Sequence, residues 1–277
     1  MLDEGKIKEL KKFAAKIRME TIKEIGSLGI GHVGSSLSIA DVLAVLYGEV
    51  MNIDPKNPRW EDRDWLILSK GHAGPALYAT LALKGYFPME ELETLNRPGT
   101  NLPSHCDRNR TVGVDMTTGS LGQGASAAAG IALGLKMENK KSYVYLILGD
   151  GECNEGQVWE MALFASQFKL GNLIAFVDYN KKQLDGDTKD ICDLGNLAGK
   201  FEEFGWHAQD VDGHDVEQIF LAIEKAKKHP DQPSMIVLNT IKGYGCSFAI
   251  GSHNIPVSKE QVEQAVKECE EAISSLN

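Results

Sequence analysis

The stretch YVYLILGDG, residues 143–151, decides the fold, because an apolar run of strand length ends abruptly in Gly149 and Asp150. A second apolar run, LIAFV at 173–177, follows about one helix later and ends close to Asn180. Short apolar strands separated by helix-length segments are typical of a parallel sheet. Because parallel strands end at one edge of a sheet, we expect Asp150 and Asn180 to lie close together. Their carboxylate and amide oxygens suit Mg²⁺, whose remaining positions phosphate and water can fill.

Composition places the chain among ordinary globular proteins. Its 277 residues suffice for one large domain or two small ones, and hydrophobic residues make up 43%. The formal net charge of -10, without a basic stripe, argues against a nucleic-acid partner. No apolar run approaches the roughly 20 residues of a membrane span, and the start lacks a signal-peptide core. We therefore expect no membrane partner and a cytoplasmic location.

Cysteine usage agrees with a reducing compartment. The five cysteines are odd in number, scattered, and form no CxxC pair. We expect reduced thiols rather than a disulfide framework or a metal site. They are Cys106, Cys153, Cys192, Cys246 and Cys269.

The rest of the chain alternates helix and strand patterns. Helices are predicted over 6–25, 38–50, 74–83, 119–137, 155–168, 194–204, 216–228 and 258–275, and strands over 65–68, 143–148, 173–177, 208–211 and 234–240. Ser38 and Ser258 are expected helix N-caps. Segments 96–118 and 185–187 are predicted loops. The pattern predicts one α/β domain over residues 1–277, with a doubly wound, mostly parallel sheet and helices on both faces.

Four of the seven histidines lie in predicted loops, flanked by glycine, serine or proline. They are His32, His72, His105 and His253. Their number in such loops favours a polar cleft that handles phosphate and protons. A zinc site is the alternative, disfavoured because no two have short ligand spacing and no cysteine pairs with them. The other three, His207, His214 and His229, are expected to be structural or exposed.

These segments resemble the diphosphate-binding part of transketolases. The matching stretches, in the family's order, are GIGHVGSSLSIADVL, DRDWLILSKGHAGPALYA, MTTGSLGQGASAAAGIALGLK, LGDGECNEGQVWEMALFA, LIAFVDYN, GWHAQDVDGHD and TIKGYGCSFAIGSHN. SKGH together with TTGxLGQG separates the chain from most other thiamine diphosphate enzymes. A full-length transketolase continues beyond the point that matches Asn277. The chain therefore resembles the N-terminal subunit of a split transketolase, with the pyrimidine-binding and C-terminal domains absent.

The resemblance implies a complete diphosphate site. Asp150, Asn180 and the backbone carbonyl of Lys182 match the ligands of Mg²⁺, for which Ca²⁺ or Mn²⁺ can substitute. The residues that match contacts to the diphosphate are Gly149, Gly151, His72 and His253.

It also implies contacts to the rest of thiamine diphosphate and to the sugar. Gly119 and Leu121 match the loop beside the aminopyrimidine and thiazolium rings. His32 and His105 match the histidines that face the reacting carbon, and all four loop histidines are candidate catalytic residues. Glu155 matches the acidic residue that links two active sites across a dimer, although a carboxylate stabilised by the helix dipole explains it equally well.

One position departs from the family. Asn96 falls where relatives have a phosphate-binding arginine, and Arg97 is next to it, which leaves the role of either in phosphate binding open. No segment resembles the part that carries the activating glutamate. We therefore expect this chain to need a C-terminal transketolase subunit, with two copies of each.

The implied activity is transfer of a two-carbon ketol unit from a ketose phosphate to an aldose phosphate. Two alternatives remain open. One is half of another thiamine diphosphate enzyme, similar to deoxyxylulose-phosphate synthase or dihydroxyacetone synthase. The other is a cofactor-binding or regulatory module without activity.

Overall fold

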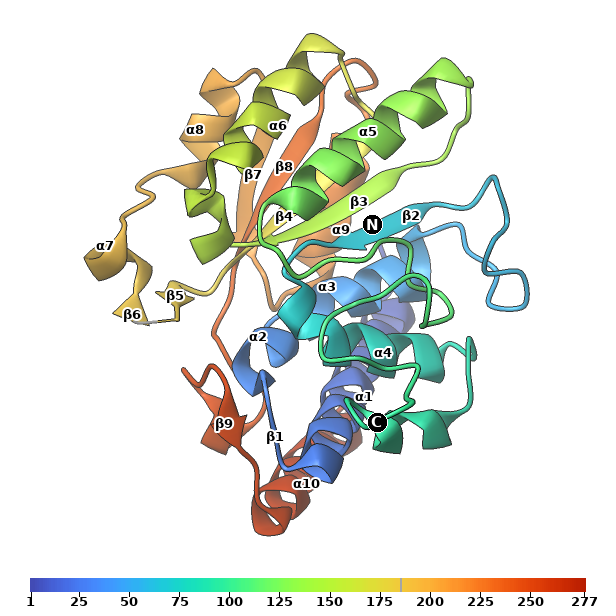
Figure 1. Ribbon diagram of the computed structural model, residues 1–277, viewed down its shortest axis with the longest axis vertical. Coiled ribbons are helices and arrows are strands. Elements are labelled where there is room, and N and C mark those ends of the chain that lie inside the picture. Colours follow the sequence, from blue (N-terminus) through green and yellow to red (C-terminus); the bar gives the residue numbers. More distant parts are fainter. Residues whose placement is uncertain (185) are drawn as a thin grey trace.

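Five parallel strands form the central sheet of the computed structural model, which describes residues 1–184 and 186–277 (Figure 1). In spatial order the strands are β2 (Trp65–Leu68), β3 (Val144–Gly149), β4 (Leu173–Tyr179), β8 (Ser234–Asn239) and β7 (His207–Asp212). All four neighbouring pairs are parallel. Their carboxyl ends therefore meet at one edge of the sheet, and the expected doubly wound α/β fold is confirmed.

The apolar runs of the sequence become strands because both faces of the sheet are buried. On β3, Val144, Leu146 and Leu148 pack into one hydrophobic cluster. Tyr145 and Ile147, between them, point into the other cluster. Alternate residues feed opposite cores, so the strand needs apolar side chains at every position.

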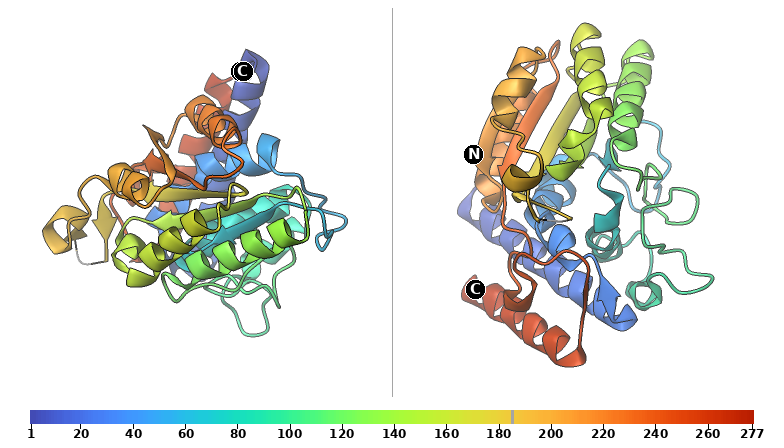
Figure 2. Two further views of the ribbon diagram at one scale, coloured as in Figure 1. Left: turned by 90° about the horizontal axis from the view of Figure 1, so that it is seen from above. Right: turned by 60° about the vertical axis from the view of Figure 1, so that its left-hand side comes forward.

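Helices cover both faces (Figures 1 and 2). On one face lie α5 (Gln123–Met137), α6 (Gly156–Gln167) and α8 (Leu197–Glu203). On the other lie α1 (Glu4–Leu28), α3 (Ala40–Val45), α4 (Gly74–Leu83) and α9 (Val216–Ala226). The closing helix α10 (Lys259–Ser275) packs along α1. It begins at Ser258, whose side chain accepts from the Gln261 amide in a capping box, as expected.

The helix predicted over 38–50 starts two residues late, because α3 begins at Ala40 and runs on into a π-helical turn at Leu46–Val50. A short helix that was not predicted, α2 (Val33–Leu37), precedes it. Ser38 is not an N-cap, because its hydroxyl donates to the Asp178 carboxylate at 2.7 Å, 140 residues away. A long-range partner therefore overrides the local capping pattern.

Two other predicted helices start late. Helix α5 begins at Gln123 instead of residue 119, because Gly119 (φ 147°) and Gly122 (φ 84°) adopt backbone conformations that a helix excludes. Helix α8 begins at Leu197 instead of residue 194, after Asn196, whose side chain caps it.

Several short elements lacked a sequence signal. Strand β1 (Ile30–Gly31) pairs with β9 (Ile255–Pro256), and β5 (Lys182–Gln183) with β6 (Gly186–Asp187), both antiparallel. The predicted loop 185–187 therefore includes β6, while residue 185 lies outside the described residues. A short helix α7 (Thr188–Ile191) and 3₁₀ turns at Gly71–Ala73, Met89–Thr94, Gly151–Asn154 and Ser247–Ala249 complete the chain.

One helical stretch, Val33–Val50, is long and apolar enough to resemble a membrane span, although no span was expected from the sequence. It is 83% buried inside the protein and is broken into three helical pieces. Its hydrophobicity is thus accounted for by the core.

Candidate active site

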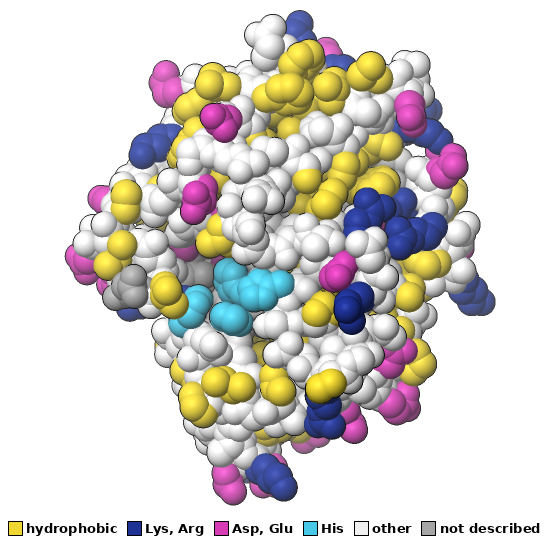
Figure 3. Space-filling model, in the orientation of Figure 1, with side chains coloured by type: hydrophobic (Ala, Val, Ile, Leu, Met, Phe, Trp, Pro, Cys, Tyr) yellow, Lys and Arg dark blue, Asp and Glu magenta, His cyan; other side chains and the backbone are white. Residues whose placement is uncertain are grey.

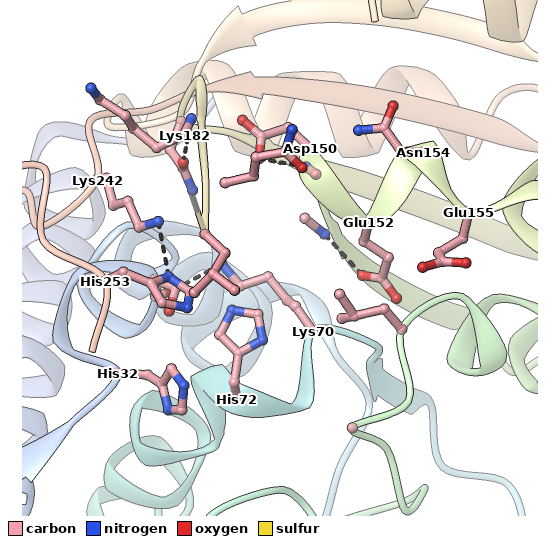
Figure 4. Close-up of a pocket in the computed structure, with 18 of the residues that line it drawn as sticks. His32, Lys70, His72, Asp150, Glu152, Asn154, Glu155, Lys182, Lys242 and His253 are labelled. Carbon is pink, nitrogen blue, oxygen red and sulfur yellow. Dashed lines mark hydrogen bonds between the residues drawn. The ribbon is translucent and has the colours of Figure 1, made fainter. Parts of the chain in front are cut away.

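A cavity of about 420 Å³ lies at the carboxyl edge of the sheet, between the loops that follow β2, β3, β4 and β8 (Figures 3 and 4). Every site residue predicted from the sequence lines it: His32, His72, His105, Gly119, Leu121, Gly149, Asp150, Gly151, Glu155, Asn180, Lys182 and His253. These residues come from segments spread over more than two hundred positions. The parallel sheet brings them together by ending its strands at one edge.

Four histidines form one wall of the cavity. The His32 ring centroid lies 5.3 Å from those of His72 and His253 and 5.9 Å from that of His105. Pairing of β1 with β9 places His32 beside His253, since each strand lies within two residues of one of them. Figure 3 shows histidine side chains gathered in a hollow of this face.

Burial keeps three of these imidazoles neutral. It lowers the pKa of His72 to about 2, with the Lys70 charge adding to the effect. It lowers the pKa of His253 to about 4, helped by Lys242, and it lowers the pKa of His32 in the same direction. A neutral imidazole offers one donor and one acceptor, so it can both hold and exchange a proton.

Asp150 is a buried carboxylate, 2% exposed, at the end of β3. Its two oxygens accept from the backbone amides of Gly151 at 2.7 Å and Lys181 at 2.6 Å. Burial and the nearby Asp178 charge nevertheless raise its pKa to about 7. A carboxylate in this condition is stabilised by a cation.

Asp178 orients Asn180, the second side chain predicted to bind Mg²⁺. Its carboxylate accepts from the Asn180 side-chain amide at 2.8 Å, from the Ser38 hydroxyl at 2.7 Å and from the Lys70 ammonium at 2.5 Å. Because the Asn180 NH₂ group faces Asp178, its oxygen is left on the side of Lys182, whose amide donates to it at 3.1 Å.

At two positions of the cavity wall, neighbouring side chains lie so close to the backbone that only glycine fits. A side chain at Gly151 would place its Cβ 2.8 Å from the Cβ of Gln183. At Gly119 it would come within 3.2 Å of the His105 ring, at a positive φ that disfavours other residues. Both positions therefore keep the backbone exposed to the cavity.

Sequence reasoning missed four polar residues of this region. Lys70, Lys242 and Glu152 line the cavity, and Asp178 is buried beneath it. Glu152 joins three loops by accepting from the Ser69 hydroxyl and the Gly122 and Gly149 amides. Lys70 lies in the SKGH stretch and Lys242 in TIKGYG, so both could have been predicted from their positions in those motifs.

The remaining predicted residues lie at the rim. Leu121 is 37% exposed, and Glu155 is exposed at the start of α6 without a capping hydrogen bond. Asn96 lines a smaller cavity of about 110 Å³ that shares His32 with the main one. The Arg97 guanidinium instead donates to the Ser27 carbonyl at 3.1 Å, on α1.

Within residues 1–184 and 186–277, no three His, Cys, Asp or Glu side chains are grouped to hold a metal ion. The zinc alternative thus finds no support in that part of the chain. The set predicted from the sequence, one carboxylate, one amide and one carbonyl, is of a different kind, and its chemistry suits a hard cation that also binds phosphate.

Comparisons with known proteins agree with this geometry. Residues 10–270 match the family described as "Transketolase, thiamine diphosphate binding domain". The 6-deoxy-6-sulfo-D-fructose transketolase subunit SqwG of Clostridium sp. (strain MSTE9) is 58% identical over 95% of this chain and 96% of its own length. The transketolase of Homo sapiens is 38% identical over 99% of this chain and 44% of its own length.

A solved transketolase from Pichia stipitis superposes with a TM-score of 0.88 and 31% identity, covering 97% of this chain. The match covers 43% of that longer protein. The chain thus spans nearly the whole of the clostridial protein and less than half of the human and yeast transketolases.

Proposed function

Because the chain belongs to the transketolase family, we propose that it is the N-terminal subunit of a two-chain transketolase, a single diphosphate-binding domain over residues 1–277. One observation carries the proposal. Residues that the resemblance assigns to metal, diphosphate, thiazolium and sugar all line one cavity of about 420 Å³. Chance would not bring so many scattered residues to one edge of the sheet.

The cavity fits Mg²⁺ and a diphosphate. Asp150 supplies a buried carboxylate whose raised pKa is relieved by a cation, and the Asn180 amide oxygen is held by Asp178. We propose that these two side chains and the Lys182 carbonyl hold Mg²⁺, with Ca²⁺ or Mn²⁺ able to substitute. His72, His253 and the backbone near Gly151 face the same space and would hold the diphosphate.

Bound thiamine diphosphate supplies a carbon nucleophile and an electron sink, which together allow the C2–C3 bond of a ketose to break. The chain's own residues position the sugar. Neutral His32, with His105 at 5.9 Å, can hold the donor's hydroxyls and move protons to and from its carbonyl oxygen. Leu121 and Gly119 form the apolar and backbone wall beside the reacting carbon.

We further propose that the donor is a sulfonated ketose. The sequence resemblance implies a ketose phosphate, whereas the relative at 58% identity is named for 6-deoxy-6-sulfo-D-fructose. In addition, Asn96 stands where the family has a phosphate-binding arginine, and Arg97 is turned toward α1. A neutral residue at that position favours the sulfonated ketose, whose terminal group carries less charge than a phosphate.

We propose that a C-terminal transketolase subunit completes the site, with two copies of each chain. The apolar Leu121 and Leu184 side chains at the cavity mouth are 37% and 71% exposed, and a partner would cover them.

The test mixes this chain with a C-terminal transketolase subunit, Mg²⁺ and thiamine diphosphate. Ketol transfer to an aldose phosphate is measured from 6-deoxy-6-sulfo-D-fructose and from fructose 6-phosphate. Activity with both chains and none with either alone is expected, with the sulfonated donor preferred. Transfer by this chain alone, or use of pyruvate as donor, would overturn the proposal.

A further inference from the structure

The turn Ile241–Tyr244 carries a lysine into the cavity. Lys242 is only 4% exposed, and its ammonium lies 3.1 Å from Nδ1 of His253 (Figure 4). The two other lysines lining the cavity, Lys70 and Lys182, form ion pairs with Asp178 and Asp187. Lys242 instead contacts a neutral imidazole, so its charge remains directed at the cavity.

A histidine outside the cavity holds one end of this turn. The Ile241 amide donates to Nε2 of His214 at 2.9 Å. Because Nε2 accepts, the ring proton sits on Nδ1, which donates to the Asp41 carboxylate at 2.8 Å. The His214 ring thus connects the backbone of the turn to a buried acid on α3.

The same acid holds the other end of the turn. Asp41 also binds the Arg18 guanidinium, whose Nε donates to the Tyr244 carbonyl at 3.0 Å. The Tyr244 ring stacks on His214 at 3.7 Å between centroids. Arg18 and Asp41 are 6% and 4% exposed, so water competes little for these bonds.

We propose that His214 is a positioning residue for Lys242. Together with Asp41 and Arg18, His214 fixes the turn that presents this lysine to an anionic cofactor. This rests on the proposed function, because the anion is taken to be the diphosphate. The sequence pattern placed His214 among the structural histidines, and it does lie outside the cavity. Its role acts through the backbone of the turn.

The packing of the turn explains why such a device is needed. A lysine has a long, flexible side chain, and holding its charge in one place costs conformational entropy unless the backbone is already fixed. The Lys242 stem passes against Gly34, where a side chain would come within 2.9 Å of Cγ. The Gly243 amide also donates to the Gly34 carbonyl at 3.0 Å. A loosened turn would therefore move the ammonium away from the cavity.

The first test needs no cofactor. Hydrogen exchange of the peptide spanning 239–246 is measured by mass spectrometry on the free chain. His214→Phe keeps the aromatic stack but loses both hydrogen bonds, and it should speed exchange at this peptide about tenfold or more. His214→Gln retains an acceptor for the Ile241 amide and should restore much of the protection. His214→Ala gives the same information if the Phe variant does not fold.

The second test measures the dissociation constant of thiamine diphosphate for the enzyme assembled with its partner subunit. His214→Phe should raise the dissociation constant about tenfold, the effect of a lost positioning hydrogen bond, while turnover at saturating cofactor stays within about twofold. If His214 only stabilised the fold, His214→Phe would lower stability without weakening cofactor binding selectively. His229→Phe is the matched control, because that ring stacks on His207, which begins β7 at the edge of the sheet opposite the turn.

Unchanged exchange at residues 239–246 in both His214→Phe and His214→Ala would overturn the inference, as would wild-type cofactor affinity in both. Failure of the wild-type chain to bind thiamine diphosphate would instead refute the proposed function, and the exchange experiment would still decide whether His214 holds the turn.

Discussion

The two edges of the sheet carry cavities of similar size but different chemistry. The carboxyl edge encloses about 420 Å³, and the amino edge has a hollow of about 530 Å³ beside Asn52, Asp64 and Tyr143. At the amino edge, Lys140 pairs with Asp62, and the buried Asp64 accepts from two backbone amides. At the carboxyl edge, Asp150 and four histidines face a common space. The comparison shows that a functional cavity is marked by ionisable side chains that point into the same space, and that cavity volume alone does not mark it.

The largest expected effect is at the unmatched carboxylate. Asp150→Asn keeps the shape of the side chain but removes the charge that neutralises Mg²⁺. Mg²⁺-dependent thiamine diphosphate binding should weaken about a hundredfold or more in a chain that still folds, although the new amide places a donor against one of the two backbone N–H groups that Asp150 accepts from and should cost about 1–3 kcal/mol of stability. Calorimetry measures the affinity, and circular dichroism checks the fold. Wild-type affinity in this variant would remove Asp150 from the metal site.

The histidine wall should matter for turnover. His32→Ala and His105→Ala should each lower kcat of the assembled enzyme about a hundredfold, the range for a lost proton donor or acceptor. Steady-state kinetics at saturating cofactor measures this. His229→Ala, remote from the cavity, is the control and should stay near wild type. Equal losses in all three variants would contradict the division between the two edges.

Much of the sheet and of the cavity lining could be predicted from the sequence, because strands and motifs are local patterns. The apolar runs predicted the five central strands, and residues that follow four of them lie at the cavity. The pairing of β1 with β9, which brings His32 to His253, was not accessible. It joins two-residue segments more than two hundred positions apart, with no periodicity to indicate it.

Long-range polar contacts were also hidden. Ser38 was expected to cap a helix, yet its hydroxyl donates to Asp178, and Asp41, three residues later, binds Arg18 and His214. A hydroxyl or carboxylate can serve a local cap or a distant partner, and only the packed chain decides between them.

A smaller effect concerns pH. Burial and the Lys70 charge lower the pKa of Lys242 to about 8, so its ammonium is lost as pH rises through that value. Affinity for thiamine diphosphate should therefore fall about tenfold between pH 7 and 9, since an anion favours the charged lysine. Calorimetry across this range tests it, and Lys242→Arg, which keeps its charge, should flatten the profile.

The sign for folding is opposite. Unfolded, the lysine keeps its proton up to about its usual pKa of 10.5, so from pH 8 to 10.5 this group makes the cofactor-free chain more stable as pH rises. Denaturant unfolding of wild type and Lys242→Arg separates this contribution from other groups. An affinity that stays constant to pH 9 in the wild type would show that Lys242 does not face the diphosphate.

The smallest effect on the cofactor is expected at the amino edge. Asp64 is buried, like Asp150, and its oxygens likewise accept from two backbone amides, those of Asn52 at 2.9 Å and Tyr143 at 2.7 Å. Unlike Asp150, it has no neighbouring carboxylate that raises its pKa. Asp64→Asn replaces one acceptor with a donor that faces an N–H group. Denaturant unfolding should show a loss of about 1–3 kcal/mol, while calorimetry shows unchanged thiamine diphosphate affinity. Weakened binding in a folded Asp64→Asn chain would mean that the two edges are coupled, and that satisfied charge does not separate structure from function here.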